Sequence, residues 1–124
     1  MIIPNNIDKR RELIINELSK YRNKSINCPC LGNVPIIINA ESIDEIAHHA
    51  AKSKMSTTAA IRLERCIKKS TFYKMHLPKN NKQKTAFKFI FLYELHSETA
   101  YGTSKIMIGV RNNAKFLQYC ITII

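Results

Sequence analysis

The sequence predicts an α+β protein, in which N-terminal helices pack on a C-terminal antiparallel sheet of about four strands. In the first part of the chain, apolar residues recur at intervals of three and four, as on one face of a helix. In the last third they alternate with a period of two, which is typical of strands. Because the two periods occupy separate parts of the chain, we expect an α+β fold. The 124 residues contain no linker and no internal repeat, so a single domain is expected over 1–124.

The first helix is expected over about residues 7–22, where apolar side chains recur at helical spacing and Asn5 or Asn6 can cap the first turn. The stretch NKSINCPCLGN at 23–33 is expected to be a loop, because a proline and a glycine interrupt it. The apolar run VPIII at 34–38 predicts a short buried strand.

Two further helices are expected in the middle of the chain. Ser42 can form a capping box with Glu45, and the helix that it begins is expected to end near Lys52. The hydroxyl residues at 56–58 are expected to begin the next helix. The apolar residues predicted to face the core are Ile43, Ile46, Ala47 and Ala50 in one helix and Ala59, Ala60, Leu63, Cys66 and Ile67 in the other.

The last third is expected to form the sheet. Residues 74–85, KMHLPKNNKQKT, are polar and basic and predict a loop. In 86–96 aromatic and aliphatic residues alternate so that both faces are largely apolar, which is typical of a central strand. Two more strands are expected over 104–111 and 116–123, joined by a turn at an Asn-Asn pair.

The final hairpin predicts two sheet faces of different character. Whether the loop near Asn112 has two or four residues, the same residues of the two strands share a face of the sheet. The face expected to pack on helices holds Ile106, Ile108, Val110, Leu117, Tyr119 and Ile121. The other face holds Lys105, Met107, Arg111, Gln118, Cys120 and Thr122, and it exposes polar groups on the sheet surface.

The positive charge is concentrated in one segment. The formal net charge is +11, and between Lys52 and Lys88 there are eleven Lys and Arg residues against one acid, Glu64. Such a segment attracts polyanions, so RNA or another nucleic acid is the leading partner class. An anionic membrane surface is a weaker alternative, because no basic helix carries bulky apolar residues on its opposite side.

The remaining composition limits the class of protein. No apolar run approaches the length of about 18–20 residues needed to cross a bilayer, and no secretory signal opens the chain, so a cytoplasmic protein that does not enter a membrane is expected. Four cysteines are expected to be buried, reduced thiols. A metal site formed by Cys28, Cys30, His48 and His49 is the alternative, but its spacing is atypical, so no metal or cofactor is predicted.

Two adjacent histidines are candidate catalytic groups. At 100° per residue, His48, His49 and Lys52 point away from the apolar face of their helix. An imidazole exchanges protons near neutral pH, and neighbouring positive charges can bind phosphate. An ordinary solvated helix surface is the competing interpretation.

These groups suit metal-free cleavage of RNA. In that reaction the 2′-hydroxyl attacks the adjacent phosphate, a base removes its proton, and an acid protonates the leaving 5′-oxygen. A lysine or arginine stabilises the charge that develops, and a hydroxyl such as Tyr119 or Thr122 can orient the phosphate. The sequence has no glycine-rich phosphate loop and no clustered carboxylates for magnesium, which makes a metal-dependent nuclease the less favoured hypothesis.

The segment NAESIDEIAHHAAKSKMSTTAAIRLERCIKKSTF and the strands FKFIFLYELH, GTSKIMIGVR and FLQYCITII resemble the barnase/EndoU/colicin/RelE-like (BECR) nuclease superfamily. The resemblance is to the barnase-like domains of large polyvalent proteins from phages and mobile conjugative elements. It covers about 34–124, which would form the nuclease core, with 1–33 as an N-terminal helix and loop.

The resemblance implies a metal-independent RNase, often a toxin. The catalytic candidates it implies are His48, His49, Lys105, Tyr119 and Thr122. A second catalytic histidine is not identified, with His76 and His96 as alternatives, and Glu94 could instead serve as a base.

We therefore expect an RNase or RNase-like toxin domain. The residues predicted to contact nucleic acid are Lys52, Lys54, Arg62, Arg65, Lys69 and Arg111. The alternatives are a catalytically inactive RNA-binding module and a protein-interaction domain bound by an acidic antitoxin or immunity partner.

Overall fold

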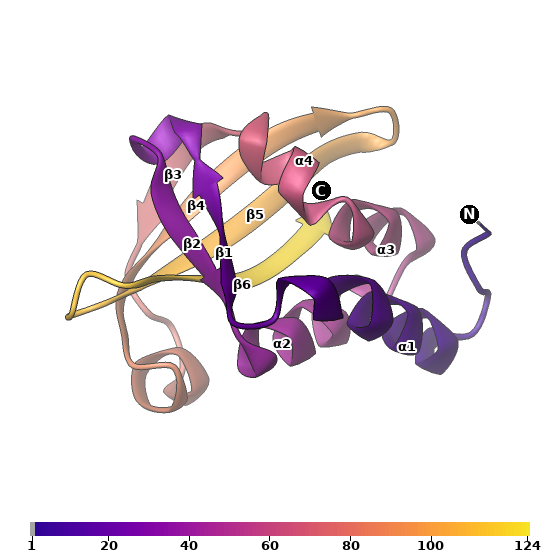
Figure 1. Cartoon of the computed structure of the whole chain (residues 1–124), viewed down its shortest axis with the longest axis horizontal. Helices are drawn as coiled ribbons and strands as arrows, with labels where there is room; N and C mark the ends of the chain where they lie inside the picture. Colours follow the sequence, from indigo (N-terminus) through magenta and orange to yellow (C-terminus); the bar gives the residue numbers. More distant parts are fainter. Residues whose placement is uncertain (1) are drawn as a thin grey trace.

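The computed structural model describes residues 2–124 and has an α+β architecture (Figure 1). Within these residues the chain forms four α-helices and one sheet of six strands in the order β1-β2-β6-β5-β4-β3. The helices are α1 (Ile7–Leu18), α2 (Ala40–Ala50), α3 (Lys54–Ile61) and α4 (Leu63–Lys68). The strands are β1 (Lys24–Cys28), β2 (Val34–Ile38), β3 (Thr71–His76), β4 (Phe89–Thr99), β5 (Gly102–Arg111) and β6 (Phe116–Ile123). Short helical turns are η1 (Ser19–Tyr21), η2 (Pro29–Leu31) and η3 (Lys82–Ala86).

The sheet is larger than predicted and is mixed. It has six strands rather than about four, and β2 pairs with β6 in parallel, whereas the other neighbours are antiparallel. The sheet also curls. As a result, the Sγ atom of Cys30, just after β1, lies 3.5 Å from the Oγ atom of Ser70, just before β3. The two edge strands thus approach each other around α4, which lies in front of β4 and β5 in Figure 1.

Two apolar clusters hold the layers together. The larger lies between the helices and one face of the sheet, and it includes all the inward-facing helix residues predicted from periodicity. The smaller lies on the opposite sheet face and consists of Phe87, Phe89, Leu92, Leu117 and Tyr119. Apolar burial of this kind is the main stabilising term of a domain of this size. Of the helices within 2–124, none has the length and apolar character needed to cross a bilayer.

The first helix is shorter than predicted. It begins after Asn6, whose side chain accepts a hydrogen bond from the Lys9 amide at 3.1 Å, and α1 ends at Leu18, followed by the tighter turn η1. The buried Arg10 donates to the carbonyl oxygen of Ala51 at 2.7 Å. This bond joins α1 to the end of α2.

The sequence predicted a loop at residues 23–33, but this prediction is wrong, because part of the segment forms a strand. Lys24–Cys28 forms the edge strand β1, which pairs antiparallel with β2. Only Ile26 and Cys28 of this strand are buried, so the apolar signal is too sparse to be recognised from the sequence. The left-handed backbone of Gly32 (φ 74°) and Asn33 (φ 62°) turns the chain into β2.

The predicted cap of α2 is wrong by three residues. The N-cap is Asn39, whose Oδ1 accepts from the Ser42 amide at 2.8 Å and from the Ser42 hydroxyl at 3.0 Å. Glu45 therefore takes no part in a capping box. Its carboxylate points elsewhere, toward His49 and Lys82.

The predicted third helix is two helices. Ser53 caps α3 by accepting a hydrogen bond from the Ser56 amide at 3.0 Å. The chain then leaves helical geometry at Arg62 (φ −106°, ψ 30°) before α4 begins. The break does not alter which residues face the core, because Leu63, Cys66 and Ile67 remain buried.

The predicted loop at 74–85 is partly structured. Its start belongs to β3, an edge strand paired with β4, and its end forms the single turn η3. Five of the six β3 residues are exposed, so no alternation of burial marks this strand in the sequence.

Two β-bulges change the predicted face assignments. A bulge between Met107 and Ile108 shifts the β5–β6 register, so that Gln118 turns inward and Leu117 and Tyr119 turn to the opposite face. Beyond the bulge the prediction is confirmed, since Lys105 pairs with Thr122 as expected. A second bulge, between Phe89 and Phe91, places Phe89 in the smaller cluster.

Candidate functional site

A row of polar side chains crosses the sheet on the face that the helices do not cover. The register pairs Thr71 with His96, His96 with Lys105, and Lys105 with Thr122. Residues paired in register project on the same face of a sheet. Four strands therefore bring a histidine, a lysine and two threonines into one line.

The next row contains a buried carboxylate that joins two histidines. Glu94 is only 6% exposed, and its Oε1 lies 2.7 Å from Nε2 of His76, while its Oε2 lies 2.5 Å from Nε2 of His96. The ring of Tyr73 stacks on His96 with centroids 4.0 Å apart. The carboxylate and the two imidazoles form what we call the Glu94 cluster (Glu94, His76 and His96).

The charge of Glu94 is stabilised by its neighbours. Burial acts to raise the pKa of this carboxyl, but hydrogen bonds from His96 and His76 and the positive charge of Lys105 outweigh it, so its pKa lies below the ordinary value. An ionised carboxylate accepts hydrogen bonds only, so each imidazole donates through Nε2–H. Nδ1 of each ring is then the nitrogen that does not bind Glu94.

A second polar cluster lies where α2 meets the η3 turn. The two oxygens of Glu45 contact Nζ of Lys82 at 2.9 Å and Nε2 of His49 at 3.1 Å. Burial acts to raise the pKa of Glu45, but Lys82 and His49 lower it below its ordinary value. For His49, burial and the charges of His48 and Lys52 lower the pKa despite the attraction of Glu45.

Tyr119 lies between this cluster and the aromatic residues of the smaller core. Its ring is 6.2 Å from that of His49 and makes edge-to-face contacts with Phe87 and Phe89 at 5.2 and 5.6 Å. Burial raises the pKa of the Tyr119 hydroxyl. It is therefore a neutral donor at physiological pH.

Cys120 relates the two clusters to each other. Burial raises the pKa of this thiol to about 12, with Lys105 opposing the shift and Glu45 adding to it. In the sheet register Glu94 pairs with Met107, and Met107 pairs with Cys120. Tyr119, whose ring lies near His49, directly precedes Cys120, so both clusters lie near this residue. They occupy neighbouring parts of one surface, linked through β6.

The catalytic candidates predicted from the sequence fall into separate groups. Lys105 and Thr122 lie side by side next to the Glu94 cluster. His49 and Tyr119 lie together in the second cluster. His48 is exposed, and its ring forms a T-shaped pair with that of His49, with centroids 5.3 Å apart.

The sequence left the roles of the Glu94 cluster open, with His76 and His96 as alternatives for a second catalytic histidine and Glu94 as an alternative base. The spacing of two between Glu94 and His96 in a strand was the available signal, because residues i and i+2 share a face. His76 could not be placed, because its segment was expected to be a loop.

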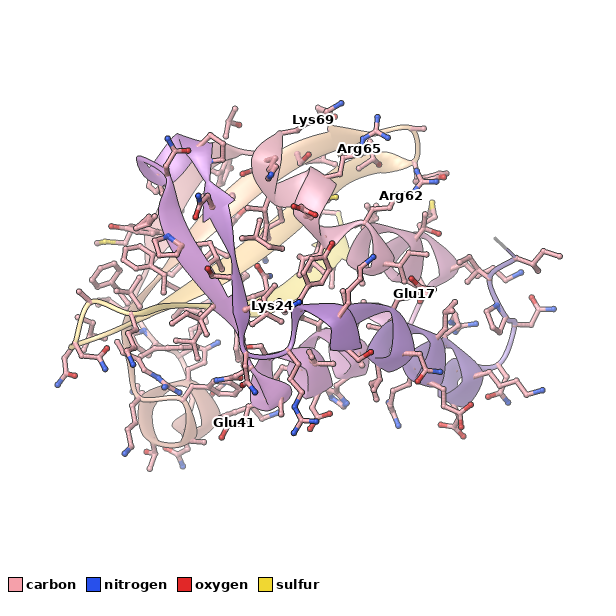
Figure 2. All side chains as sticks on the ribbon, viewed as in Figure 1. Glu17, Lys24, Glu41, Arg62, Arg65 and Lys69 are labelled. Atoms are coloured by element: carbon pink, nitrogen blue, oxygen red, sulfur yellow. The ribbon has the colours of Figure 1, made fainter. Side chains whose placement is uncertain are left out.

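The predicted basic contacts are divided between different parts of the surface. Lys52 and Lys54 are exposed around the turn between α2 and α3. Three other cations lie on α4 (Arg65) or at its two ends (Arg62 and Lys69), beside the β4–β5 hairpin, as Figure 2 shows. Arg111 donates from Nε to the carbonyl oxygen of Phe87 at 2.8 Å, so part of its guanidinium has a structural role.

The cysteines do not support the metal-site alternative. Cys28 and Cys30 lie at the end of β1, with their sulfur atoms 3.6 Å apart, and burial raises the pKa of Cys28 to about 11. All four cysteines are free. In the part of the chain from 2 to 124, no three His, Cys, Asp or Glu side chains are arranged to hold a metal ion.

No known protein family, no curated protein and no solved structure matches the chain. The resemblance to BECR nucleases therefore stays a prediction, and function is argued from the geometry alone.

Proposed function

We propose that this chain is a metal-independent RNase domain that cleaves RNA by attack of the 2′-hydroxyl on the adjacent phosphate. The observation that supports this most strongly is the Glu94 cluster with Lys105 beside it. It supplies two proton-exchanging imidazoles, a carboxylate that fixes their orientation, and a positive charge on one sheet face.

The proposed reaction uses the two imidazoles in opposite protonation states. The neutral one, either His76 or His96, takes the proton of the 2′-hydroxyl at Nδ1 while the oxygen attacks phosphorus. The protonated one gives its proton to the leaving 5′-oxygen as the phosphorus–oxygen bond breaks. The products are a 2′,3′-cyclic phosphate and a 5′-hydroxyl, and the catalyst ends with its two protonation states exchanged.

Lys105 and Thr122 are assigned to the phosphate. The ammonium of Lys105 stabilises the extra negative charge of the pentavalent species, and the hydroxyl of Thr122 donates to a non-bridging oxygen. The role of Glu94 is positioning, because its pKa is lowered and an ionised carboxylate holds both rings by their Nε2 atoms.

The second cluster is assigned to the neighbouring nucleotide. His49 and Tyr119 present an imidazole and a phenol, and Lys82, which is paired with Glu45, adds an ammonium group. The exposed His48, Lys52 and Lys54 contact the RNA backbone in this proposal, with affinity that decreases as salt increases.

The test is cleavage of a single-stranded RNA in the presence of EDTA by matched double variants. We expect H76Q/H96Q to lower the rate by about 10²–10⁴-fold, because it removes the acid and the base. The competing assignment from the sequence is tested by H48Q/H49Q, for which we expect a loss of less than about tenfold, the size of one lost phosphate contact. A larger loss in H48Q/H49Q than in H76Q/H96Q would transfer the catalytic roles to α2.

A catalytically inactive RNA-binding module is the second candidate. It is favoured by the exposed lysines of the 79–88 segment, of which Lys82 lies in the second cluster at Glu45. In that case RNA binding weakens steeply with salt, RNA stays intact, and neither double variant changes more than affinity.

A further inference from the structure

A separate basic cavity lies on the helix-covered side of the sheet. It has a volume of about 190 Å³ and lies between the α3–α4 helices and the tip of the β4–β5 hairpin. At the hairpin, the buried Ser104 donates to the carbonyl oxygen of Ser97 at 3.0 Å. Since His96 and Lys105 adjoin these serines in the strands, they project to the other face. The cavity is therefore distinct from the Glu94 cluster.

Three cations line this cavity and are available to a ligand. In Figure 2, Arg62, Arg65 and Lys69 extend from α4 and its two ends beside the hairpin. Within residues 2–124, none of the three makes a side-chain hydrogen bond or an ion pair. The one acid in the lining is Glu98, whose Oε1 accepts from the Thr103 hydroxyl at 2.9 Å. A net excess of positive charge remains, as expected of a site for a phosphate.

The rest of the lining combines small hydroxyl residues with apolar ones. The buried Ala59 and Cys66 belong to the helices, and Ala100 and Tyr101 to the hairpin tip. Tyr101 is 43% exposed, so its ring is accessible at the hairpin tip. An exposed aromatic ring beside arginines is the combination that stacks on a nucleobase whose phosphate is held nearby.

We propose that this cavity binds one nucleotide, with its phosphate at Arg62, Arg65 and Lys69 and its base against Tyr101. The volume of about 190 Å³ is below the range of about 300–1,000 Å³ typical of small-molecule pockets, so the cavity would enclose only part of one nucleotide. The nucleotide is either free or the 5′-phosphorylated end of an RNA. The proposal does not rest on the cleavage activity, because the two sites lie on different faces.

The experiment is calorimetric titration of the whole chain carrying H76Q/H96Q, so that no RNA is consumed. The probes are 5′-AMP, adenosine and inorganic phosphate. We expect 5′-AMP to bind at least about tenfold more tightly than either adenosine or phosphate, because only it engages both the cations and Tyr101. Titration with two RNAs of one sequence, with and without a 5′-phosphate, then shows whether the natural ligand is an RNA end or a free nucleotide. A preference for the phosphorylated end assigns the site to RNA ends, and no preference assigns it to free nucleotide.

Matched variants locate the site. R62Q/R65Q should weaken 5′-AMP binding by about tenfold or more, and Y101A should reduce the affinity for 5′-AMP to that for phosphate. The control is K24Q, which removes an exposed positive charge on β1, away from this cavity, and should have no effect. Circular dichroism of each variant confirms folding. Absence of 5′-AMP binding, or equal binding by R62Q/R65Q and K24Q, would overturn the proposal, whatever the outcome of the cleavage assay.

Discussion

Replacing Glu94 with glutamine should destabilise the protein by disrupting the Glu94 cluster. The side chain is buried, and its two oxygens accept from His76 and His96 at 2.7 and 2.5 Å. Glutamine is uncharged and its amide nitrogen only donates, so one imidazole loses the charged acceptor for its Nε2–H. Loss of a hydrogen bond to a charged group costs about 1.5–3 kcal/mol. Water does not weaken these hydrogen bonds much, because the carboxylate of Glu94 is buried.

The assay is urea denaturation at pH 7, with E98Q as the matched control. Glu98 is exposed and its carboxylate accepts one bond from Thr103, so E98Q should change the free energy of unfolding by no more than about 0.5 kcal/mol. Equal destabilisation by the two substitutions would refute the claim that Glu94 joins the two histidines.

The effect of E94Q should also depend on pH. The pKa of Glu94 lies below its ordinary value of 4.5 in the folded protein, so its ionised form stabilises the fold above that pH. This stabilisation is lost as the pH falls through the folded-state pKa. The difference between wild type and E94Q should therefore shrink on acidification below 4.5, and a difference that is constant from neutral to strongly acidic pH would contradict the reasoning.

Three further predictions concern the fold around the site. Gly109→Ala should destabilise by about 1–3 kcal/mol in the same denaturation assay, because a Cβ there would lie 2.1 Å from Cζ of Phe89; an unchanged midpoint would show that Phe89 can move aside. Ala114→Gly should stabilise by about 0.5–1 kcal/mol, since Ala114 has a left-handed backbone (φ 63°), and a lower melting temperature would contradict this. The pKa of His49 is below 6.5 in the folded protein, so its neutral form stabilises the fold above that pH. As the pH falls below 6.5, the free energy of unfolding should therefore decrease more steeply for wild type than for H49Q. An equal pH dependence of the two proteins would refute this prediction.

Helical periodicity was the most reliable guide to the core. The inward faces of α2, α3 and α4 were identified from spacing alone, because the apolar residues there follow one face without interruption. The caps were less predictable. Asn39 and Ser42 both suit an N-cap, and the choice between them depends on where β2 ends, which periodicity does not specify.

The sheet shows where a single sequence is insufficient. The edge strands β1 and β3 bury few of their residues, so they lack the alternation that marked β4, β5 and β6. The bulge in the β5–β6 pairing adds one residue to β6, so the faces predicted from the turn hold for Ile121 but not for Leu117 and Tyr119. Tyr119 therefore lies on the side of His49. The Glu94 cluster depends on pairing β3 with β4, a contact between distant segments that no local pattern encodes.

The most direct test of the proposed mechanism is cleavage of an RNA in which one susceptible nucleotide carries 2′-deoxyribose, compared with the unmodified RNA in EDTA. Attack by the 2′-hydroxyl predicts that the modified position resists cleavage, while the unmodified one yields a 2′,3′-cyclic phosphate in an H76Q/H96Q-sensitive reaction. Cleavage at the deoxy position, or equal cleavage by the wild type and H76Q/H96Q, would contradict the central claim.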